Sequence, residues 1–228
     1  METGFTTPLP EECKGFIAKC FAGKQEEMTS FLEKMAVLQQ YLYETNEKFN
    51  LTALPPSAFW SKHVADSLSL VLALPQIGEK ALSLLDLGCG AGFPSLVLAS
   101  AFPCLKVFSV DSTNKKISFV NSAAEKLSLR NLTGIHARGN ELARKDPYKC
   151  NMDIVTARAV ASADILVKES FAFLKNNGKS LLAVYRTSTQ LEEEKEFLNR
   201  NKKFSWEATS LFSLPEEAGT RQFLFIRR

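Results

Sequence analysis

The stretch Leu84–Pro94, which reads LLDLGCGAGFP, decides the fold of this chain. It begins within a short apolar run, Leu82–Leu87, of the kind expected for a strand that is buried on both faces. Three glycines follow at every second position, and a helical apolar pattern extends over Leu96–Phe102. Strand, glycine turn and helix form the first unit of a doubly wound α/β sheet, in which ligands bind at the carboxyl ends of the strands.

The glycines Gly88, Gly90 and Gly92 remove Cβ atoms where the backbone must bend sharply and approach a ligand closely. Their spacing is G-x-G-x-G, whereas dinucleotide-binding proteins have G-x-G-x-x-G. Phe93 occupies the position of the last glycine in that fingerprint. The turn therefore predicts a nucleotide-type site and disfavours a nicotinamide-dependent enzyme.

Two acidic residues support this interpretation. A second apolar run, Lys106–Val110, ends in Asp111, about 20 positions beyond the turn, where a carboxylate can accept hydrogen bonds from a ribose diol. Asp86 precedes the turn, as an acidic residue often does in enzymes that use S-adenosylmethionine (SAM). Together these features predict a SAM-type site.

Composition limits the other function classes. The 228 residues are 45% hydrophobic and carry 28 Lys and Arg against 25 Asp and Glu, so the chain is globular and only mildly basic. Five scattered cysteines and two histidines disfavour a zinc site, and we expect no metal. No signal peptide or membrane-length apolar run is evident, so we expect a cytoplasmic protein without membrane association.

The first 75 residues predict a helical extension that packs on the core. Apolar residues recur at helical spacing from about Gln25 to Phe49, and Ser57 is a good N-cap for a second helix that reaches Ala73. On that second helix, three polar residues share one face, which suggests a solvated surface or a capping network; they are His63, Asp66 and Ser67. Trp60 lies on its apolar face and is expected in the core.

Residues 76–228 predict one methyltransferase domain. Expected strands at about 82–87, 106–110, 132–137, 153–157 and 179–186 alternate with helices at about 94–102, 112–127, 162–175 and 188–200. The segment 138–141 is expected to be a loop, and Phe204–Leu211 with Gln222–Arg227 fit a closing antiparallel pair. This order predicts an α/β, Rossmann-like class I SAM-dependent methyltransferase, with a seven-stranded, mostly parallel sheet covered by helices on both faces.

At the level of motifs the chain resembles the bacterial small-subunit ribosomal RNA methyltransferase G family, also called glucose-inhibited division protein B. The matching segments are Asn50-Leu51-Thr52, W-x-x-H-x-x-D-S from Trp60 to Ser67, D-L-G-x-G-x-G-F-P from Asp86 to Pro94, D-S-x-x-K-K-x-x-F from Asp111 to Phe119, Arg138, and Arg158-Ala159. The resemblance implies transfer of a methyl group from SAM to N7 of one guanine in 16S rRNA of the 30S subunit, by a protein that we expect to be monomeric.

The resemblance also implies roles for individual residues. Those implied to bind SAM are Gly88, Gly90, Phe93, Asp111, Ser112, Thr113, Gly139, Asn140 and Arg158. Arg158 is further expected to position the substrate beside the transferred methyl group. Two departures from the family pattern concern Asn140, where Glu is common, and Tyr185-Arg186, where Lys-Gly is usual. The second departure could alter how the base or the RNA backbone is held.

Guanine N7 has an exposed lone pair and no proton to lose, so the predicted reaction needs no general base. The protein must instead align the reactants, and Arg158 is the candidate to hold guanine O6 or a phosphate. The base could stack on Phe59, Trp60 or Phe93, although each could equally belong to the core. The candidate phosphate contacts are Lys115, Lys116, Arg138, Arg144, Lys145, Arg200, Lys202 and Lys203.

Two other function classes remain open at this point. A methyltransferase with a small-molecule or protein substrate would keep the SAM site without the RNA. A non-catalytic RNA-binding module would keep the fold without transfer, although the intact glycines and Asp111 argue against it.

Overall fold

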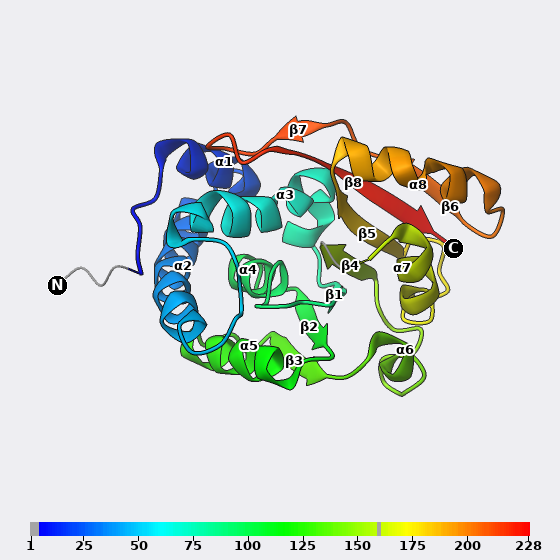
Figure 1. Cartoon of the computed structure of the whole chain (residues 1–228), viewed down its shortest axis with the longest axis horizontal. Helices are drawn as coiled ribbons and strands as arrows, with labels where there is room; N and C mark the ends of the chain where they lie inside the picture. The colour runs from blue at the N-terminus through cyan, green and yellow to red at the C-terminus, as the bar shows by residue number, and fades with distance from the viewer. Residues whose placement is uncertain (1–4, 159–160) are drawn as a thin grey trace.

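The computed structural model describes residues 5–158 and 161–228, so Ala159 of the Arg158-Ala159 motif lies outside the described residues. A central sheet is covered by helices on both faces (Figure 1). Its strands are β1 (Ser83–Leu87), β2 (Lys106–Asp111), β3 (Leu132–His136), β4 (Ile154–Arg158), β5 (Leu181–Arg186), β6 (Ser205–Ala208), β7 (Phe212–Ser213) and β8 (Thr220–Arg227).

The strand order is β3-β2-β1-β4-β5-β8-β6. Strands β1 to β5 are parallel to their neighbours, and β8 and β6 close the sheet as an antiparallel pair. The expected class I methyltransferase sheet is confirmed, with seven strands on this path and the two-residue β7 added beside β8. The order reverses at β1, so the carboxyl ends of β1, β2 and β4 flank the crevice where such sheets bind ligands.

Alternate residues of each strand enter opposite halves of the core, as the two-residue period of a strand requires. Leu84 belongs to a hydrophobic cluster that also contains residues of five helices: α1 (Glu11–Phe21), α2 (Gln25–Asn46), α3 (Asp66–Ala73), α4 (Ser95–Ala101) and α5 (Asn114–Lys126). Leu85 belongs to a second cluster, with residues of α6 (Gly139–Leu142), α7 (Ala163–Ser170) and α8 (Ser188–Arg200). Both halves are apolar, which explains the nearly continuous apolar strands.

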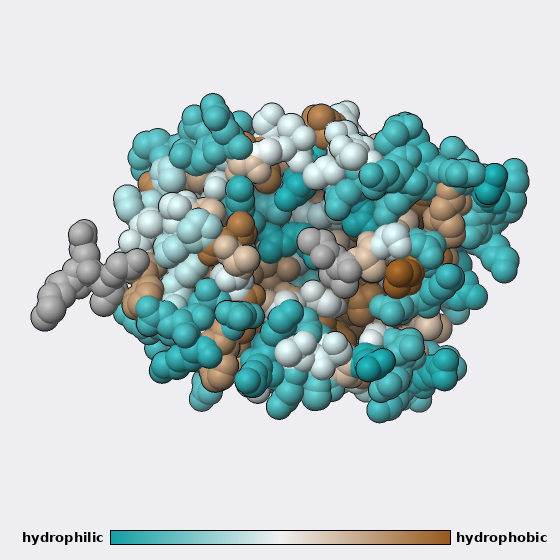
Figure 2. Space-filling model, in the orientation of Figure 1, coloured by the Kyte–Doolittle hydropathy of each residue, from teal (hydrophilic) through white to brown (hydrophobic). Residues whose placement is uncertain are grey.

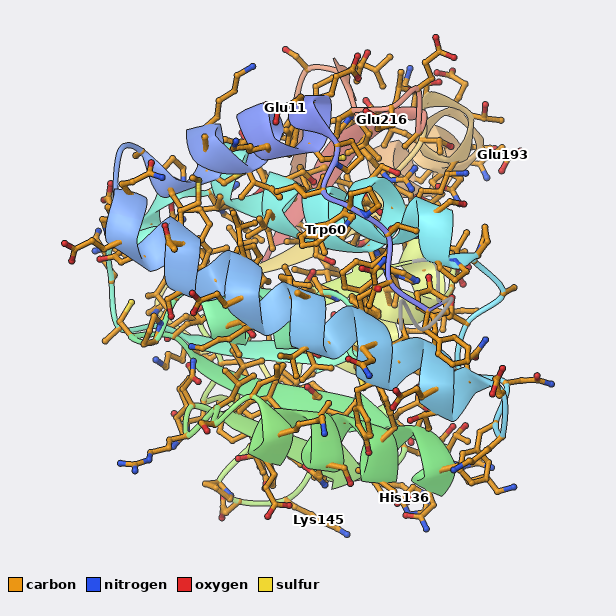
Figure 3. All side chains as sticks on the ribbon, turned by 90° about the vertical axis from the view of Figure 1, so that its left-hand side faces the viewer. Glu11, Trp60, His136, Lys145, Glu193 and Glu216 are labelled. Atoms are coloured by element: carbon orange, nitrogen blue, oxygen red, sulfur yellow. The ribbon has the colours of Figure 1, made fainter. Side chains whose placement is uncertain are left out.

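In the side view of Figure 3, helix α2 runs across the front of the molecule, below the cyan segment that carries Trp60 and above α5. One hydrophobic cluster extends from Ile17 and Met35 in the first two helices to Leu84 and Val107 in the sheet. The N-terminal helices thus share their core with the sheet. The expected division into 1–75 and 76–228 stays a prediction.

The expected helix from Ser57 to Ala73 is confirmed in extent, because the chain is helical without a break from Pro56 to Ala73, but its type changes along its length. A 3-10 turn, η1 (Pro56–Ala58), and a π-helix, η2 (Phe59–Ala65), precede α3, and Ser57 does not cap any of them. The expectation that Phe49 continues the helical stripe is also wrong, because α2 ends at Asn46 and Phe49 is exposed. No helix among the described residues is both long and apolar enough to cross a bilayer.

Candidate functional site

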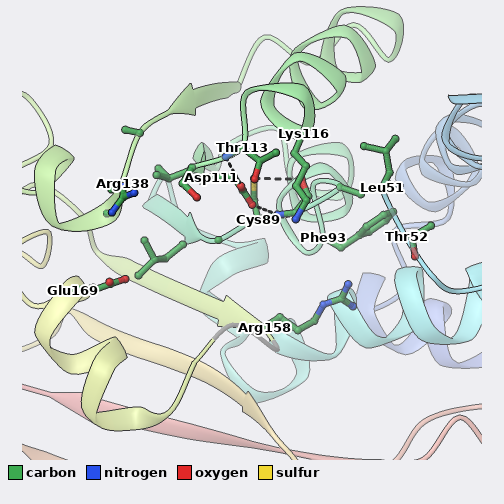
Figure 4. Close-up of a pocket in the computed structure, with 18 of the residues that line it drawn as sticks. Leu51, Thr52, Cys89, Phe93, Asp111, Thr113, Lys116, Arg138, Arg158 and Glu169 are labelled. Atoms are coloured by element: carbon green, nitrogen blue, oxygen red, sulfur yellow. Dashed lines mark hydrogen bonds between the residues drawn. The ribbon is translucent and has the colours of Figure 1, made fainter. Parts of the chain in front are cut away.

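A pocket of about 710 Å³ opens at the carboxyl ends of β1, β2 and β4 (Figure 4). Polar side chains gather around the middle of the face shown in Figure 2. The structure brings all the predicted cofactor residues together on the wall of this pocket: Gly88, Gly90, Phe93, Asp111, Ser112, Thr113, Gly139, Asn140 and Arg158. The topology and the motif thus converge on one crevice.

The glycine turn is closed by hydrogen bonds to the neighbouring strand. The backbone N–H groups of Gly88 and Cys89 donate to the Val110 carbonyl at 2.8 and 3.0 Å. All three motif glycines have positive φ, at 71° for Gly88, 57° for Gly90 and 82° for Gly92. A Cβ on Gly92 would lie 2.4 Å from Leu96 Cδ1, whereas one on Gly90 would meet nothing within 4 Å. Gly92 therefore allows the following helix to pack, and Gly90 leaves open space beside the turn.

Asp111 fixes the geometry between the turn and the next helix. Its Oδ2 accepts from the Gly90 N–H at 3.0 Å and its Oδ1 accepts from the Thr113 N–H at 2.8 Å. Each carboxylate oxygen has two lone pairs, so one on each oxygen remains for a ligand hydroxyl pair. The carboxylate is oriented by backbone groups before any ligand arrives.

Asp86 lies behind the turn and is buried. Its Oδ2 accepts from the Ser95 N–H at 3.2 Å, and its Oδ1 has no hydrogen-bond partner among the described residues. Burial raises the pKa of this carboxyl to about 6, although the Ser95 hydrogen bonds and the charge of Arg158 lower it. Asp86 holds the first turn of α4 and does not line the pocket.

The segment 138–141, predicted to be a loop, contains a short helix, α6. The first residue of this helix, Gly139, is a glycine for a packing reason. A Cβ on Gly139 would lie 2.6 Å from Leu87 Cδ1, so any other residue at this position would require the Leu87 side chain at the end of β1 to shift. Asn140 lines the pocket beside it, and Glu169 of α7 closes this side. The departure from Glu at position 140 leaves an uncharged amide there.

Arg158 forms the opposite wall at the end of β4. Its Nη1 donates to Asp66 Oδ2 and to the Lys62 carbonyl, both at 3.1 Å, and its side chain is 15% exposed. Asp66 is also paired with Arg221 of β8, with 2.8 Å between Arg221 Nε and Asp66 Oδ1. The expectation of a solvated or capping trio at His63, Asp66 and Ser67 is wrong, because all three are buried.

His63 lies between this arginine wall and the glycine turn. Its ring stacks on Phe93 with centroids 4.1 Å apart, and Arg158 lies over the same Phe93 ring at 5.7 Å. His63 Nε2 is 3.2 Å from Thr52 Oγ1, and its Nδ1 is buried with no partner among the described residues. Burial and the charge of Arg158 lower the pKa of His63 to about 3, so the ring is neutral near pH 7.

The structure separates the three aromatic candidates for base stacking. Phe59 and Trp60 are buried, and Trp60 Nε1 donates to the Thr7 carbonyl at 3.0 Å, so its expected place in the core is confirmed. Phe93 also belongs to the core cluster, but it lines the pocket.

The side chains of Tyr185 and Arg186, where the family pattern has Lys-Gly, point into the protein. The Tyr185 hydroxyl donates to the Ser67 carbonyl at 2.9 Å, and Arg186 Nε donates to Glu194 of α8 at 2.9 Å. Both residues are buried. Burial argues against a direct contact of either side chain with a base or the RNA backbone, and the expected effect of this departure stays a prediction.

The basic residues proposed as phosphate contacts do not all lie at the pocket. Lys116 and Arg138 line the pocket, whereas Arg200, Lys202 and Lys203 surround a separate shallow depression at the end of α8. Within the described residues, no group of three or more His, Cys, Asp or Glu could hold a metal ion.

Sequence reasoning missed four contributors to the site. Thr52 and His63 stand in motifs of the resemblance, but nothing in their spacing indicates that they meet at the pocket. Arg221 and Glu169 carry no signal at all, because strand β8 and helix α7 reach the site only through the sheet order.

Sequence comparison identifies related proteins. The family model described as rRNA small subunit methyltransferase G matches residues 31–223. Proteins named ribosomal RNA small subunit methyltransferase G are 40% identical over 149 residues in Lacticaseibacillus paracasei and 41% identical over 156 residues in Lactococcus lactis. These alignments cover 64% and 68% of this chain, and they span 61% and 64% of the two relatives' lengths.

Solved structures support the fold. An O-methyltransferase from Bacillus cereus, solved in complex with S-adenosylhomocysteine (SAH), matches 83% of this chain and 89% of its own, with a TM-score of 0.58 and 15% identity. A SAM-dependent O-methyltransferase from Thermotoga maritima matches 80% of this chain and 69% of its own, with a TM-score of 0.54 and 18% identity.

Proposed function

The chain belongs to the rRNA small subunit methyltransferase G family, and we propose that it transfers the methyl group of SAM to N7 of a guanine in 16S rRNA of the 30S subunit. The single observation that carries this proposal is the pocket in which the glycine turn and Asp111 face Arg158 and Phe93. One wall suits a nucleoside, and the other offers a cation and an aromatic ring.

The residues present fit SAM. The open lone pairs of Asp111 suit the ribose hydroxyls, and the space beside Gly90 admits a ligand that a side chain would exclude. Ser112 and Thr113 would border the ribose and adenine side, and Gly139 and Asn140 would lie against the adenine. Gly88 and Phe93 would contact the same ligand near the turn.

SAM supplies a methyl group on a sulfonium, which is already an electrophile. The guanine N7 lone pair forms the new bond, the carbon–sulfur bond breaks, and its electron pair stays on sulfur to give SAH. No proton moves in this step, so the site needs no general base. Alignment of the reacting atoms can contribute about 7 kcal/mol or more to lowering the barrier.

His63 and Arg158 serve this alignment in different ways. A neutral His63 stacks on Phe93 without placing a further positive charge beside the sulfonium. Arg158 would donate to guanine O6 or to a phosphate, because its planar fork matches both. The target guanine must be unstacked, since A-form RNA hides its major-groove edge.

The position that the resemblance implies is guanine 527 of 16S rRNA. Modest net charge supports a structured ribonucleoprotein substrate over naked RNA. We further propose that the protein acts as a monomer in the cytoplasm.

The test is transfer of a tritiated methyl group from SAM to 30S subunits that lack the modification. We expect label in 16S rRNA and chain cleavage at one guanine after borohydride and aniline treatment, which acts on N7-methylguanosine. Label that resists this cleavage would contradict N7 as the acceptor. Equal activity on deproteinised 16S rRNA would contradict the ribonucleoprotein substrate.

The same material separates the alternatives. A small-molecule or protein methyltransferase would leave rRNA digests from a deletion strain unchanged in mass. A non-catalytic RNA-binding module would show no heat of SAM binding by calorimetry.

A further inference from the structure

One carboxylate, Asp66, is shared by two arginines that come from distant strands. Arg158 of β4 lies 3.1 Å from Asp66 Oδ2, and Arg221 of β8 lies 2.8 Å from Oδ1 through Nε and 3.3 Å from Oδ2 through Nη2. The Asp66 side chain is 2% exposed, against 15% for Arg158 and 25% for Arg221. We call these three residues the Asp66 cluster.

Only one member of the cluster reaches the pocket. Arg158 lines it, whereas Asp66 and Arg221 do not (Figure 4). Arg158 uses Nη1 for both of its hydrogen bonds, to Asp66 and to the Lys62 carbonyl. Asp66 therefore fixes the guanidinium from behind and from one nitrogen, which leaves the rest of the fork for a ligand.

The charges of the cluster add to +1, which matters for the ligand that it can hold. A carboxylate paired with Arg158 alone would cancel the positive charge that faces the pocket. Arg221 contacts both oxygens of the same carboxylate, so two guanidinium groups share one negative charge and one positive charge of the cluster remains uncompensated. An anionic or carbonyl-bearing acceptor is attracted by such a wall, and a neutral apolar acceptor is not.

Fold stability alone does not explain this arrangement. Burying three charged groups costs free energy, and packed apolar residues of the same volume usually stabilise a protein at least as well. By contrast, the ion pair between Arg227 of β8 and Glu207 of the neighbouring strand β6 lies nearer the surface, with side chains 32% and 59% exposed.

We infer that Asp66 and Arg221 are positioning residues, which hold Arg158 at the pocket wall with a net positive charge and thereby select an acceptor that carries phosphate. This inference rests on the proposed rRNA methyltransferase function. Asp66 sets the orientation of Arg158, and Arg221 keeps its charge available.

The experiment is a double-mutant cycle on 30S subunits with Arg158→Met and Arg221→Met, in which kcat and KM for the subunit are measured. Arg227→Met is the matched control on the same strand. We expect Arg221→Met to raise KM about tenfold with little change in kcat or SAM affinity, and to lower the slope of log KM against log salt by about 0.7–0.9, the loss of one phosphate contact. Arg221→Lys keeps the positive charge, so its KM should lie close to the wild-type value.

The cycle separates action through Arg158 from direct contact. Because Arg221 acts through Arg158, adding Arg221→Met to Arg158→Met should change KM less than twofold. Additive effects would overturn the inference, as would an Arg221→Met variant that behaves like Arg227→Met. SAM affinity by calorimetry shows that each variant is folded.

A second readout does not depend on transfer. The Arg158 Nε–H signal, assigned by its loss in Arg158→Lys, should report slow rotation of the guanidinium in the wild-type protein and fast rotation in Asp66→Asn. Equal rotation in both would overturn the positioning role. A wild-type protein that holds Arg158 but transfers no methyl group to 30S subunits would overturn the proposed function and leave the positioning of Arg158 supported.

Discussion

The two walls of the pocket are built in different ways. The wall at β1 and β2 comes from residues 86–113, in which the turn, Asp111 and Thr113 contact one another through the backbone. The wall at β4 joins Thr52, Asp66, Arg158 and Arg221, and the paired residues Asp66 and Arg221 are 155 positions apart in the sequence. The first wall is a local structure, and the second exists only when the whole chain has folded.

A methyltransferase must bind both its methyl donor and its acceptor, and the two walls correspond to these two requirements. The proposed cofactor is common to many methyltransferases, and most of the residues that would bind it lie in one local segment. The acceptor differs among them, and the wall that would meet it is assembled from long-range contacts. Variants of the two walls should therefore fail in different ways.

The largest effect should come from Gly92 of the local wall. Gly92→Ala places a Cβ 2.4 Å from Leu96 at a φ of 82°, and overpacking together with left-handed strain should lower the free energy of unfolding by about 3–5 kcal/mol. Gly90→Ala is the matched control, since it has open space and only the strain, about 1–2 kcal/mol. Urea denaturation measures both, and equal losses would contradict the packing role of Gly92.

The next effect distinguishes the walls by function. Asp111→Ala should weaken SAM binding about 100-fold, or about 2.7 kcal/mol, because it removes a preoriented carboxylate. Arg158→Ala should lower transfer to 30S subunits about 100-fold and change SAM affinity far less. Calorimetry and labelled transfer measure the two, with Arg200→Ala as the surface control. A reversed pattern would contradict the assignment of the walls.

The pH dependence of stability should show that the buried His63 ring, in the wall at β4, is held in its neutral form. Its folded pKa is about 3, below the ordinary 6.5, so below pH 6.5 the unfolded chain takes up a proton that the folded protein does not. Wild type should therefore lose about 3 kcal/mol relative to His63→Phe between pH 7 and pH 4. Denaturation at both pH values measures this difference. A constant difference would show that the ring is not held neutral.

Asp86 should change the stability in the opposite direction to His63 as the pH falls. Its folded pKa of about 6 exceeds the ordinary 3.8, so the folded protein binds a proton first and gains stability as the pH falls from 6 towards 4. Asp86→Asn should remove this gain. The two variants together show which buried group dominates below pH 6.

The smallest effect should come from Tyr185. Tyr185→Phe removes one hydrogen bond to the Ser67 carbonyl and should lower the free energy of unfolding by about 1 kcal/mol, with transfer activity unchanged. Thermal unfolding and the labelled assay measure the two quantities. A large loss of transfer would place this departure from the family pattern in the acceptor site.

The local wall could be predicted from the sequence because a strand, glycines at fixed spacing and an acidic residue each have a short-range physical cause. The succession of strands and helices along the chain followed from the alternation of apolar runs and helical patterns. The buried cluster could not be predicted, because helical spacing places His63 and Asp66 on one face but does not say what covers that face. The π-helix over Phe59–Ala65 also changes the register that an α-helical pattern assumes.

The central claim is that the local wall holds the methyl donor and the long-range wall faces the acceptor. A crystal structure of the SAH complex tests it most directly. We predict the ribose hydroxyls on Asp111, the adenine against Asn140, and the sulfur directed towards the space beside Arg158 and Phe93. SAH bound elsewhere, or with its ribose on the Arg158 side, would contradict the account.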